Sequence, residues 1–400
     1  MKSHPKLVIL PSLRFAAMPD GRFVLTRKFL EGVQEYLRFW PGPIAVLVEA
    51  DTTASDNLDN VCVVPTELPF RIKLVEYSKL DGEAELADAA VVLASAGHEQ
   101  NHVARLCKRI GVPCVYVTEY SLRTREQIVE ADTHNWLRKL RRRFWERAQE
   151  RRQRVAIAAA DGVQCNGTPT FDAYRHVNRR PLLFFDTRVS QDMLATRAEI
   201  DLRLAHCLSN HPLRLLFSGR LIAMKGVDHL LLVARYLKAW GVAFELTICG
   251  EGDRAENLRS GVVAYGLSQQ VSISGVLDFH RDLVPMVKHQ TDVFVCCHRQ
   301  GDPSCTYLET MGCGVPVAGY DNEAFTGVVA SSGAGWPVAM NQPQALALKI
   351  QELDRDRSLI AIESHKSLAF AQLHTFDATF RKRIEHLQSI CADGQLLASK

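Results

Sequence analysis

Short apolar runs alternate with longer segments of helical periodicity along the chain. In the first half the runs predict strands at Leu7–Leu10, Ile44–Val48, Val61–Val64, Ala90–Ala94 and Val112–Thr118, then Val163–Asn166 and Leu182–Phe185. Helices are predicted between them, for example at Val24–Phe39 and Gln100–Ile110. The second half repeats the pattern with strands at Leu213–Phe217, Phe244–Cys249 and Val271–Ser274, and helices at Val227–Ala239 and Arg281–Lys288. This alternation predicts parallel, doubly wound sheets.

The stretch Asp292–Glu323 contains the clearest single unit. An apolar strand, Val293–Val295, is followed by the polar loop Gly301–Ser304 and a helix beginning at about Ser304 or Cys305. The glycines at 312 and 314 are expected to end this helix before a short strand at Val315–Val317. In such a βαβ unit, backbone N–H groups and the helix dipole favour an anion at the helix N-terminus.

The length of 400 residues indicates two domains, and 47% apolar with 23% charged residues indicates a soluble globular chain. We expect a first domain at residues 1–190 and a second at 191–375, with a final helix at about 376–400 that packs back on the first. The mixed, polar-rich segment Asp186–Pro212 is typical of a linker. A net charge of +3 does not argue for nucleic acid as a partner.

Nothing in the sequence predicts export or membrane spanning. The segment Met1–Lys6 precedes an apolar run of only four residues, shorter than the core of a signal peptide, and no run approaches the length of a spanning helix. The eleven cysteines include no CxxC pair and are expected to be reduced thiols, with no metal site. These features favour a cytoplasmic location.

One segment is strongly basic. Leu137–Arg154 carries nine Arg or Lys against two Glu, with Leu and aromatic residues near helical spacing. A solvated helix face is one interpretation. The other is attachment to an anionic membrane surface or to a lipid-phosphate acceptor, which would make the chain peripheral on the inner face of a membrane. No recognisable nucleic-acid-binding module accompanies the patch.

Three groups of residues could carry chemistry. Arg220 and Lys225 flank a strand-to-helix turn, and two cations there suit a diphosphate. Glu309 lies among apolar residues of the predicted helix, so a half-buried carboxylate there needs hydroxyl or cationic partners. The loop Leu13–Arg22 is expected at the carboxyl edge of the first sheet, where ligands bind in open α/β folds.

The ordered motifs SGRLIAMKGVDHLL, ICGEGD, VSISGVL and DVFVCCHRQGDPSCTYLETMGCGVPVAGY resemble the donor-binding domain of GT-B glycosyltransferases, specifically retaining family 4. The resemblance is close from about Leu213 to Gly335 and faint over residues 1–190. It implies a GT-B fold, with two Rossmann-like, doubly wound domains facing a central cleft. It also implies a nucleotide-diphosphate sugar, UDP- or GDP-linked, as co-substrate, with no cofactor.

The resemblance assigns roles to individual residues. Arg220 and Lys225 would hold the donor diphosphate, Glu309 would bind ribose hydroxyls, and the Val276-Leu277 backbone would read the base. His98 is a looser match to a histidine that lines the cleft. The remaining donor-binding positions are Gly21, Gly219, Gly250, Gly252, Gly301, Asp302, Pro303, Ser304, Cys305 and Thr306, and the acceptor side would include Arg22, Glu119 and Tyr120.

Two departures concern the sugar end of the site. The first glutamate of the family's pair should fall at Gly301, where the adjacent Asp302 could substitute for it, and Glu119-Tyr120 stands where the family often has histidine. We therefore expect a hexosyltransferase that acts with retention in polysaccharide or glycolipid assembly, on a carbohydrate or lipid-linked acceptor. The alternative is a non-catalytic protein that binds nucleotide sugars. A nicotinamide-dependent dehydrogenase is disfavoured because no full GxGxxG motif with its distal acidic residue occurs.

Overall fold

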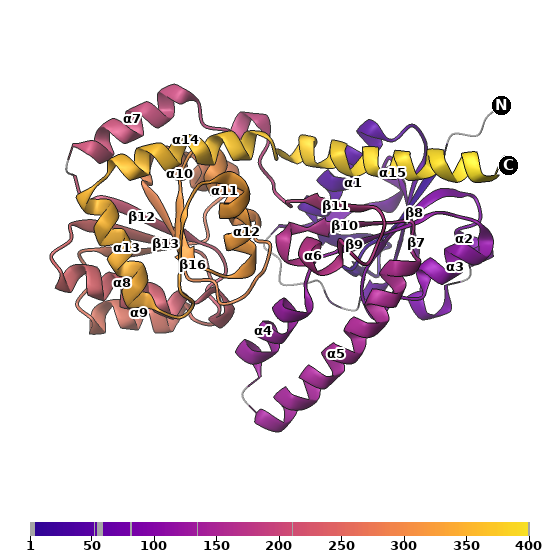
Figure 1. Cartoon of the computed structure of the whole chain (residues 1–400), viewed down its shortest axis with the longest axis horizontal. Helices are drawn as coiled ribbons and strands as arrows, with labels where there is room; N and C mark the ends of the chain where they lie inside the picture. The colour runs from indigo at the N-terminus through magenta and orange to yellow at the C-terminus, as the bar shows by residue number, and fades with distance from the viewer. Residues whose placement is uncertain are drawn as a thin grey trace.

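The computed structural model describes residues 5–51, 53, 59–80, 82–133, 135–209 and 211–398. The beginning of the predicted N-terminal segment, at residues 1–4, and the last two residues of the predicted final helix lie outside the described residues. Two α/β bodies lie side by side, and the C-terminal helix runs from one to the other (Figure 1).

The first domain is built on a seven-stranded parallel sheet with the order β11-β10-β9-β8-β1-β4-β7. The strands are β1 (Lys6–Leu10), β4 (Ile44–Val48), β7 (Arg71–Leu74), β8 (Ala89–Ser95), β9 (Cys114–Thr118), β10 (Gly162–Asn166) and β11 (Pro181–Phe184). The helices are α1 (Arg27–Phe39), α2 (Gly82–Glu85), α3 (Val103–Ile110), α4 (Leu122–Asp132), α5 (Trp136–Ala159) and α6 (Gly167–Tyr174). Alternate residues of β1 enter different cores, Leu7 and Ile9 on one face and Val8 and Leu10 on the other. A strand covered on both faces must be apolar throughout, which explains its unbroken hydrophobic run.

A second, four-stranded sheet corrects part of the expectation for this domain. Its order is β5 (Ala50–Asp51), β2 (Phe15–Ala17), β3 (Phe23–Thr26) and β6 (Asn60–Val63), with β3 antiparallel to both β2 and β6. The segment expected as a ligand-binding loop after β1 therefore contains strand β2, and the run at residues 61–64 does not join the parallel sheet. The first helix starts at Arg27 because Thr26 caps it, accepting a hydrogen bond from the Phe29 amide at 3.3 Å.

The second domain has a six-stranded parallel sheet with the order β14-β13-β12-β15-β16-β17. Its strands are β12 (Leu213–Ser218), β13 (Phe244–Cys249), β14 (Val271–Gly275), β15 (Val293–Cys296), β16 (Val317–Tyr320) and β17 (Trp336–Val338). Its helices are α7 (Arg197–Leu208), α8 (Val227–Ala239), α9 (Ala255–Ala264), α10 (Val284–Gln290), α11 (Cys305–Gly312), α12 (Glu323–Ser332), α13 (Pro343–Arg355) and α14 (Ser358–Gln372). The prediction of two doubly wound domains is confirmed.

The segment expected as a linker contains helix α7, and this expectation was wrong. Thr196 and Glu199 form a reciprocal capping box at its start, which is a signal present in the sequence. The side chain of Arg203 is buried and donates hydrogen bonds to the carbonyl oxygens of Cys313, at 2.8 Å, and Gly314. Helix α7 therefore anchors the turn that ends α11.

The last helix, α15 (Phe376–Ala398), leaves the second domain and lies along the first (Figure 1). Phe380, Ile384 and Leu387 enter the same core as residues of α1, and the rings of Tyr36 and Phe380 are 5.2 Å apart. Helices α4 and α5 stand out together from the body of the first domain (Figure 1). No helix among the described residues is long and apolar enough to cross a membrane.

Candidate active site

A cleft of about 830 Å³ lies where the carboxyl ends of β12, β13 and β14 meet the first domain. One wall consists of predicted site residues from four separate segments: Gly219, Arg220, Gly250, Val276, Leu277, Thr306 and Glu309. The opposite wall comes from α1 and includes Arg27 and Lys28. The cleft is thus at the sheet edge where open α/β folds bind ligands.

Close approach of two strand ends requires glycine in this wall. Gly250 has φ 135°, and a Cβ there would lie 1.9 Å from the carbonyl oxygen of Gly219. Gly252 has φ 158°, and a Cβ there would lie 2.5 Å from the carbonyl oxygen of Leu221. Any side chain at either position would push apart the turns after β12 and β13. Gly252 does not itself line the cleft.

The predicted basic pair is divided by the structure. Arg220 is exposed and lines the cleft, and its side chain makes no hydrogen bond or ion pair among the described residues. Lys225 is buried, does not line the cleft, and forms an ion pair with Asp302 at 3.0 Å between Nζ and Oδ2. Arg220 is therefore available to a ligand, whereas Lys225 fixes the loop that contains Asp302.

Glu309 has the cationic partner that its half-buried position requires. The Nε of Arg188 donates to Glu309 Oε1 at 2.8 Å, and the guanidinium lies 4.1 Å from the centroid of the Phe279 ring. Burial opposes the charge of Arg188, but Glu309 outweighs that effect and raises the pKa of Arg188. Arg188 lines the cleft. Arg188 was not predicted as a site residue, because its segment resembled a linker. The only sequence signal for it was that a half-buried Glu309 needs a cationic or hydroxyl partner.

Lys28 joins the first domain to the start of α11. It forms an ion pair with Asp186, and its Nζ lies 3.0 Å from the Cys305 sulfur. Burial opposes the charge of both ionic groups, yet their mutual attraction raises the pKa of Lys28 and lowers that of Asp186. Burial, with Asp186 beside it, raises the pKa of the Cys305 thiol to about 12, so the thiol stays neutral. Cys305 therefore contacts the first domain, while its neighbour Thr306 faces the cleft.

Several predicted residues lie away from the cleft. Gly21 and Arg22 form the exposed turn between β2 and β3, where the Nε of Arg22 donates to Asp20 at 2.7 Å. The His98 ring packs against Trp145 of α5, with centroids 5.4 Å apart. Pro303 and Ser304 border a space of about 10 Å³ beside residues of the first domain.

Glu119 and Tyr120 follow strand β9. The amide nitrogen of Asn166 donates to Glu119 at 2.8 Å. Glu119 keeps an exposed surface, yet the protein around it displaces much of the water, and this burial together with Asp186 raises its pKa to about 7. Burial and the charge of Asp302 raise the pKa of Tyr120, which places this ring near the loop after β15. Neither residue lines the 830 Å³ cleft.

Comparison with known proteins agrees with this architecture. Residues 205–368 match the family described as glycosyl transferases group 1. The putative colanic acid biosynthesis glycosyltransferase WcaL of Salmonella typhimurium is 29% identical over 150 residues, which are 36% of each chain. The amylovoran biosynthesis glycosyltransferase AmsK of Erwinia amylovora is 25% identical over 192 residues, 44% of this chain and 46% of that protein. The matches thus span less than half the length of these curated relatives.

A solved structure matches over nearly the whole chain. HepE of Anabaena, in complex with UDP, superposes with a TM-score of 0.68 at 15% identity and covers 96% of this chain and 99% of that one. The protein therefore has the GT-B fold that the sequence predicted.

Proposed function

We propose that this protein is a glycosyltransferase that moves a hexose from a nucleotide-diphosphate sugar to an acceptor hydroxyl, with retention of anomeric configuration. The observation that carries the proposal is the 830 Å³ cleft, in which an unpaired arginine, a helix start and a half-buried carboxylate face one space. The arginine and the helix start suit the phosphates of a nucleotide diphosphate, and the carboxylate suits its ribose.

The chemistry of each group supports a donor orientation. Arg220 and the N-terminal amides of α11, near Thr306, would bind the diphosphate, because both supply positive charge and hydrogen-bond donors. Glu309, held by Arg188, would accept hydrogen bonds from ribose hydroxyls. Val276 and Leu277 also line the cleft, and the base would lie against their backbone.

The proposed transfer needs no protein nucleophile. The bond between the anomeric carbon and the diphosphate oxygen breaks, and Arg220 stabilises the charge that develops on the leaving group. The acceptor hydroxyl attacks the same face, and the departing diphosphate takes its proton. We propose that this reaction is independent of metal, so chelation with EDTA leaves the rate unchanged.

We propose a lipid-linked or membrane-surface acceptor in polysaccharide or glycolipid assembly, reached at the cytoplasmic face. Helix α5 supports this, because its exposed side chains include Trp136, Leu137, Leu140, Phe144 and Trp145. Basic side chains without a partner among the described residues accompany them: Arg138, Arg141, Arg151 and Arg152. Apolar rings flanked by arginines match the interface of an anionic bilayer.

Vesicle binding tests the membrane component. Charge reversal of Arg138, Arg141 and Arg151 should abolish sedimentation with phosphatidylglycerol-containing vesicles, while pure phosphatidylcholine vesicles bind little in either case. A matched control reverses the exposed basic residues of α3, Arg105, Lys108 and Arg109, and should retain binding. Equal binding by both triple variants would refute the role of α5.

One observation favours a second candidate, a non-catalytic protein that binds nucleotide sugars. Gly301 carries no side chain, and the adjacent Asp302 is paired with Lys225, so no unpaired carboxylate lies at this position. Under both candidates, a nucleotide sugar at a hundredfold excess over its Kd adds about 2.7 kcal/mol to the free energy of unfolding. The melting temperature rises accordingly. Only the enzyme hydrolyses or transfers the bound sugar, so release of nucleoside diphosphate distinguishes them.

A further inference from the structure

The loop at residues 300–304 is held by the opposite domain. The backbone N–H of Gly301 donates to Gln127 Oε1 at 2.8 Å, and the hydroxyl of Thr124 donates to the Gly301 carbonyl oxygen at 3.2 Å. Gln127 and Thr124 lie on α4 of the first domain, whereas Gly301 belongs to the second. Gly301 is buried, so both backbone polar groups of this one residue are satisfied across the domain boundary.

The contact leaves little space for a side chain at position 301. A Cβ there would lie 3.2 Å from Thr124 Oγ1 and 3.2 Å from Glu323 Cβ. Glu323 is itself bound by Arg123 of α4, with 3.0 Å between the charged atoms. A side chain at 301 would therefore require Thr124 of α4 or Glu323 of α12 to shift by a few tenths of an ångström, and glycine lets α4 approach the loop closely.

The loop leads directly into the cleft wall. After Gly301, Asp302 is held by Lys225 and its carbonyl oxygen accepts a hydrogen bond from the Ser304 amide at 2.7 Å. Helix α11 then begins at Cys305, and its residues Thr306 and Glu309 line the cleft. A shift of Gly301 would thus displace the helix start that faces the proposed diphosphate position.

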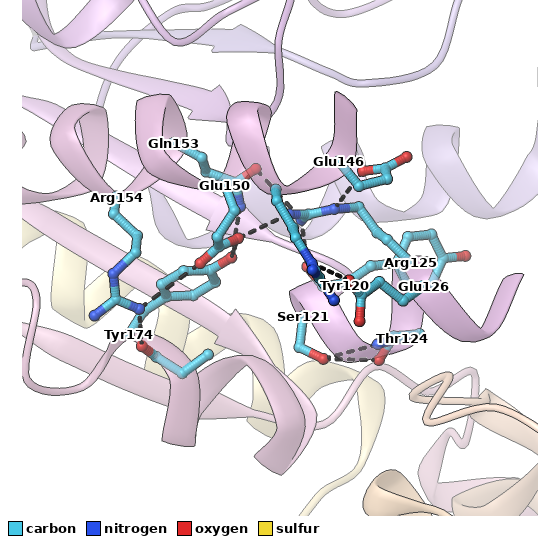
Figure 2. Close-up of polar contacts among 12 residues, drawn as sticks. Tyr120, Ser121, Thr124, Arg125, Glu126, Glu146, Glu150, Gln153, Arg154 and Tyr174 are labelled. Carbon is cyan, nitrogen blue, oxygen red and sulfur yellow. Dashed lines mark hydrogen bonds and ion pairs between the residues drawn. The ribbon is translucent and has the colours of Figure 1, made fainter. Parts of the chain in front are cut away.

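Helix α4 is fixed in turn by a polar network against α5, shown in Figure 2. Arg125 lies at its centre, pairing with Glu146 at 2.9 Å and Glu150 at 2.7 Å, and donating to the Tyr120 carbonyl oxygen at 3.0 Å. The Tyr174 hydroxyl donates to the same Glu150 carboxylate at 2.9 Å. The arginine side chain is largely buried, so the network holds α4 more firmly than a surface ion pair would.

We propose that Gln127 and Thr124 are positioning residues for glycosyl transfer, which act through the backbone of Gly301 to set the start of α11 against the donor. The inference rests on the proposed function, because it assigns a role in that site. It also gives the first domain a direct influence on donor geometry, since the groups that bind both backbone polar atoms of Gly301 come from α4, while Lys225 of the second domain holds the neighbouring Asp302.

The test compares Gln127→Met and Thr124→Val, which remove the polar groups and keep similar volumes, with Glu126→Met. Glu126 is the adjacent residue of α4 and contacts Arg147 of α5 instead of the loop, so it is a matched control. The readouts are amide hydrogen exchange of peptides spanning residues 298–306, and donor KM and kcat. The donor is whichever of UDP-glucose, UDP-galactose and GDP-mannose the wild type uses best.

We expect faster exchange at residues 301–304 and a roughly five- to tenfold higher donor KM in Gln127→Met and Thr124→Val, the effect of losing one hydrogen bond. Acceptor KM should stay unchanged, and Glu126→Met should behave as the wild type in every readout. Unchanged exchange and donor kinetics in both test variants would overturn the positioning role. A wild type that transfers none of these sugars, with faster exchange in the two variants, would count against the proposed function alone.

Discussion

Arg220 and Lys225 provide the sharpest contrast in the site, because the same substitution should affect different properties. Arg220 is exposed in the cleft without a partner among the described residues, so Arg220→Ala should change the free energy of unfolding by no more than about 0.5 kcal/mol. If it binds the diphosphate, the loss of a charged hydrogen-bond donor should cost about 2–4 kcal/mol of transition-state stabilisation. That corresponds to a fall in kcat/KM of roughly 30- to 1000-fold.

Lys225→Ala should instead lower stability. The side chain is 8% exposed and that of its partner Asp302 is 19% exposed, so the substitution leaves a carboxylate unpaired in a largely buried position. Such a loss costs about 3–5 kcal/mol, or roughly 6–20 °C in the melting temperature of a domain of this size. Adding Asp302→Ala should recover part of the loss, because the two residues are coupled.

Differential scanning calorimetry and donor kinetics on the two single variants and the double variant measure these effects separately. Equal destabilisation by Arg220→Ala and Lys225→Ala would refute the division between a ligand-facing and a loop-fixing residue. Wild-type donor affinity and turnover in Arg220→Ala would refute the assignment of the cleft to a diphosphate.

Two further predictions follow from the same geometry. Arg188→Met should weaken binding of the preferred nucleotide about tenfold in a calorimetric titration, because Glu309 loses the hydrogen bond that holds it. An unchanged affinity would show that the Arg188–Glu309 pair does not bind the ribose. The pKa of Glu119 is raised from 4.5 to about 7, so folding favours its protonated form, and the associated stability is lost as pH rises through that window. Glu119→Gln should therefore gain stability relative to the wild type between about pH 4.5 and 7 in urea unfolding, and a pH-independent difference would contradict the burial of this carboxyl.

Much of the second domain could be predicted because its determinants are local. Helix α11 begins at Cys305 and ends at Gly312 as expected, since a polar loop precedes it and glycines follow it. Helix α8 also has the predicted bounds, because a local signal again marks its start: Gly226, at φ 63°, directly precedes it. Strand β16 begins at Val317, two residues later than predicted, because apolar character alone does not locate the first ladder hydrogen bond.

The first domain was harder to predict where pairing is not local. Strands β2, β3, β5 and β6 are short, and although β2 and β3 are neighbours in the sequence, β5 and β6 join them from segments that lie far along the chain. The parallel edge strand β7 was missed because its sequence, RIKL, is charged at alternate positions and mostly exposed.

The cleft shows the same limit. The cleft residues of the second domain were predictable from sequence motifs. Lys28 and Arg188, in contrast, come from segments without a motif and acquire their partners only through the tertiary structure. The contact of α4 with Gly301 likewise depends on how the domains meet. The sequence marked Gly301 as unusual, but only the packing of Thr124 and Glu323 gives a physical reason for the missing side chain.

We propose that the cleft binds a nucleotide sugar and that the protein cleaves it there. The most direct measurement incubates the protein with a panel of UDP- and GDP-linked hexoses and follows both nucleoside diphosphate release and the anomeric configuration of the product by NMR. We expect one donor to be cleaved with retention, and Arg220→Ala to slow this cleavage while the protein stays folded. A panel in which no nucleotide sugar is cleaved, or a product with inverted configuration, would contradict it.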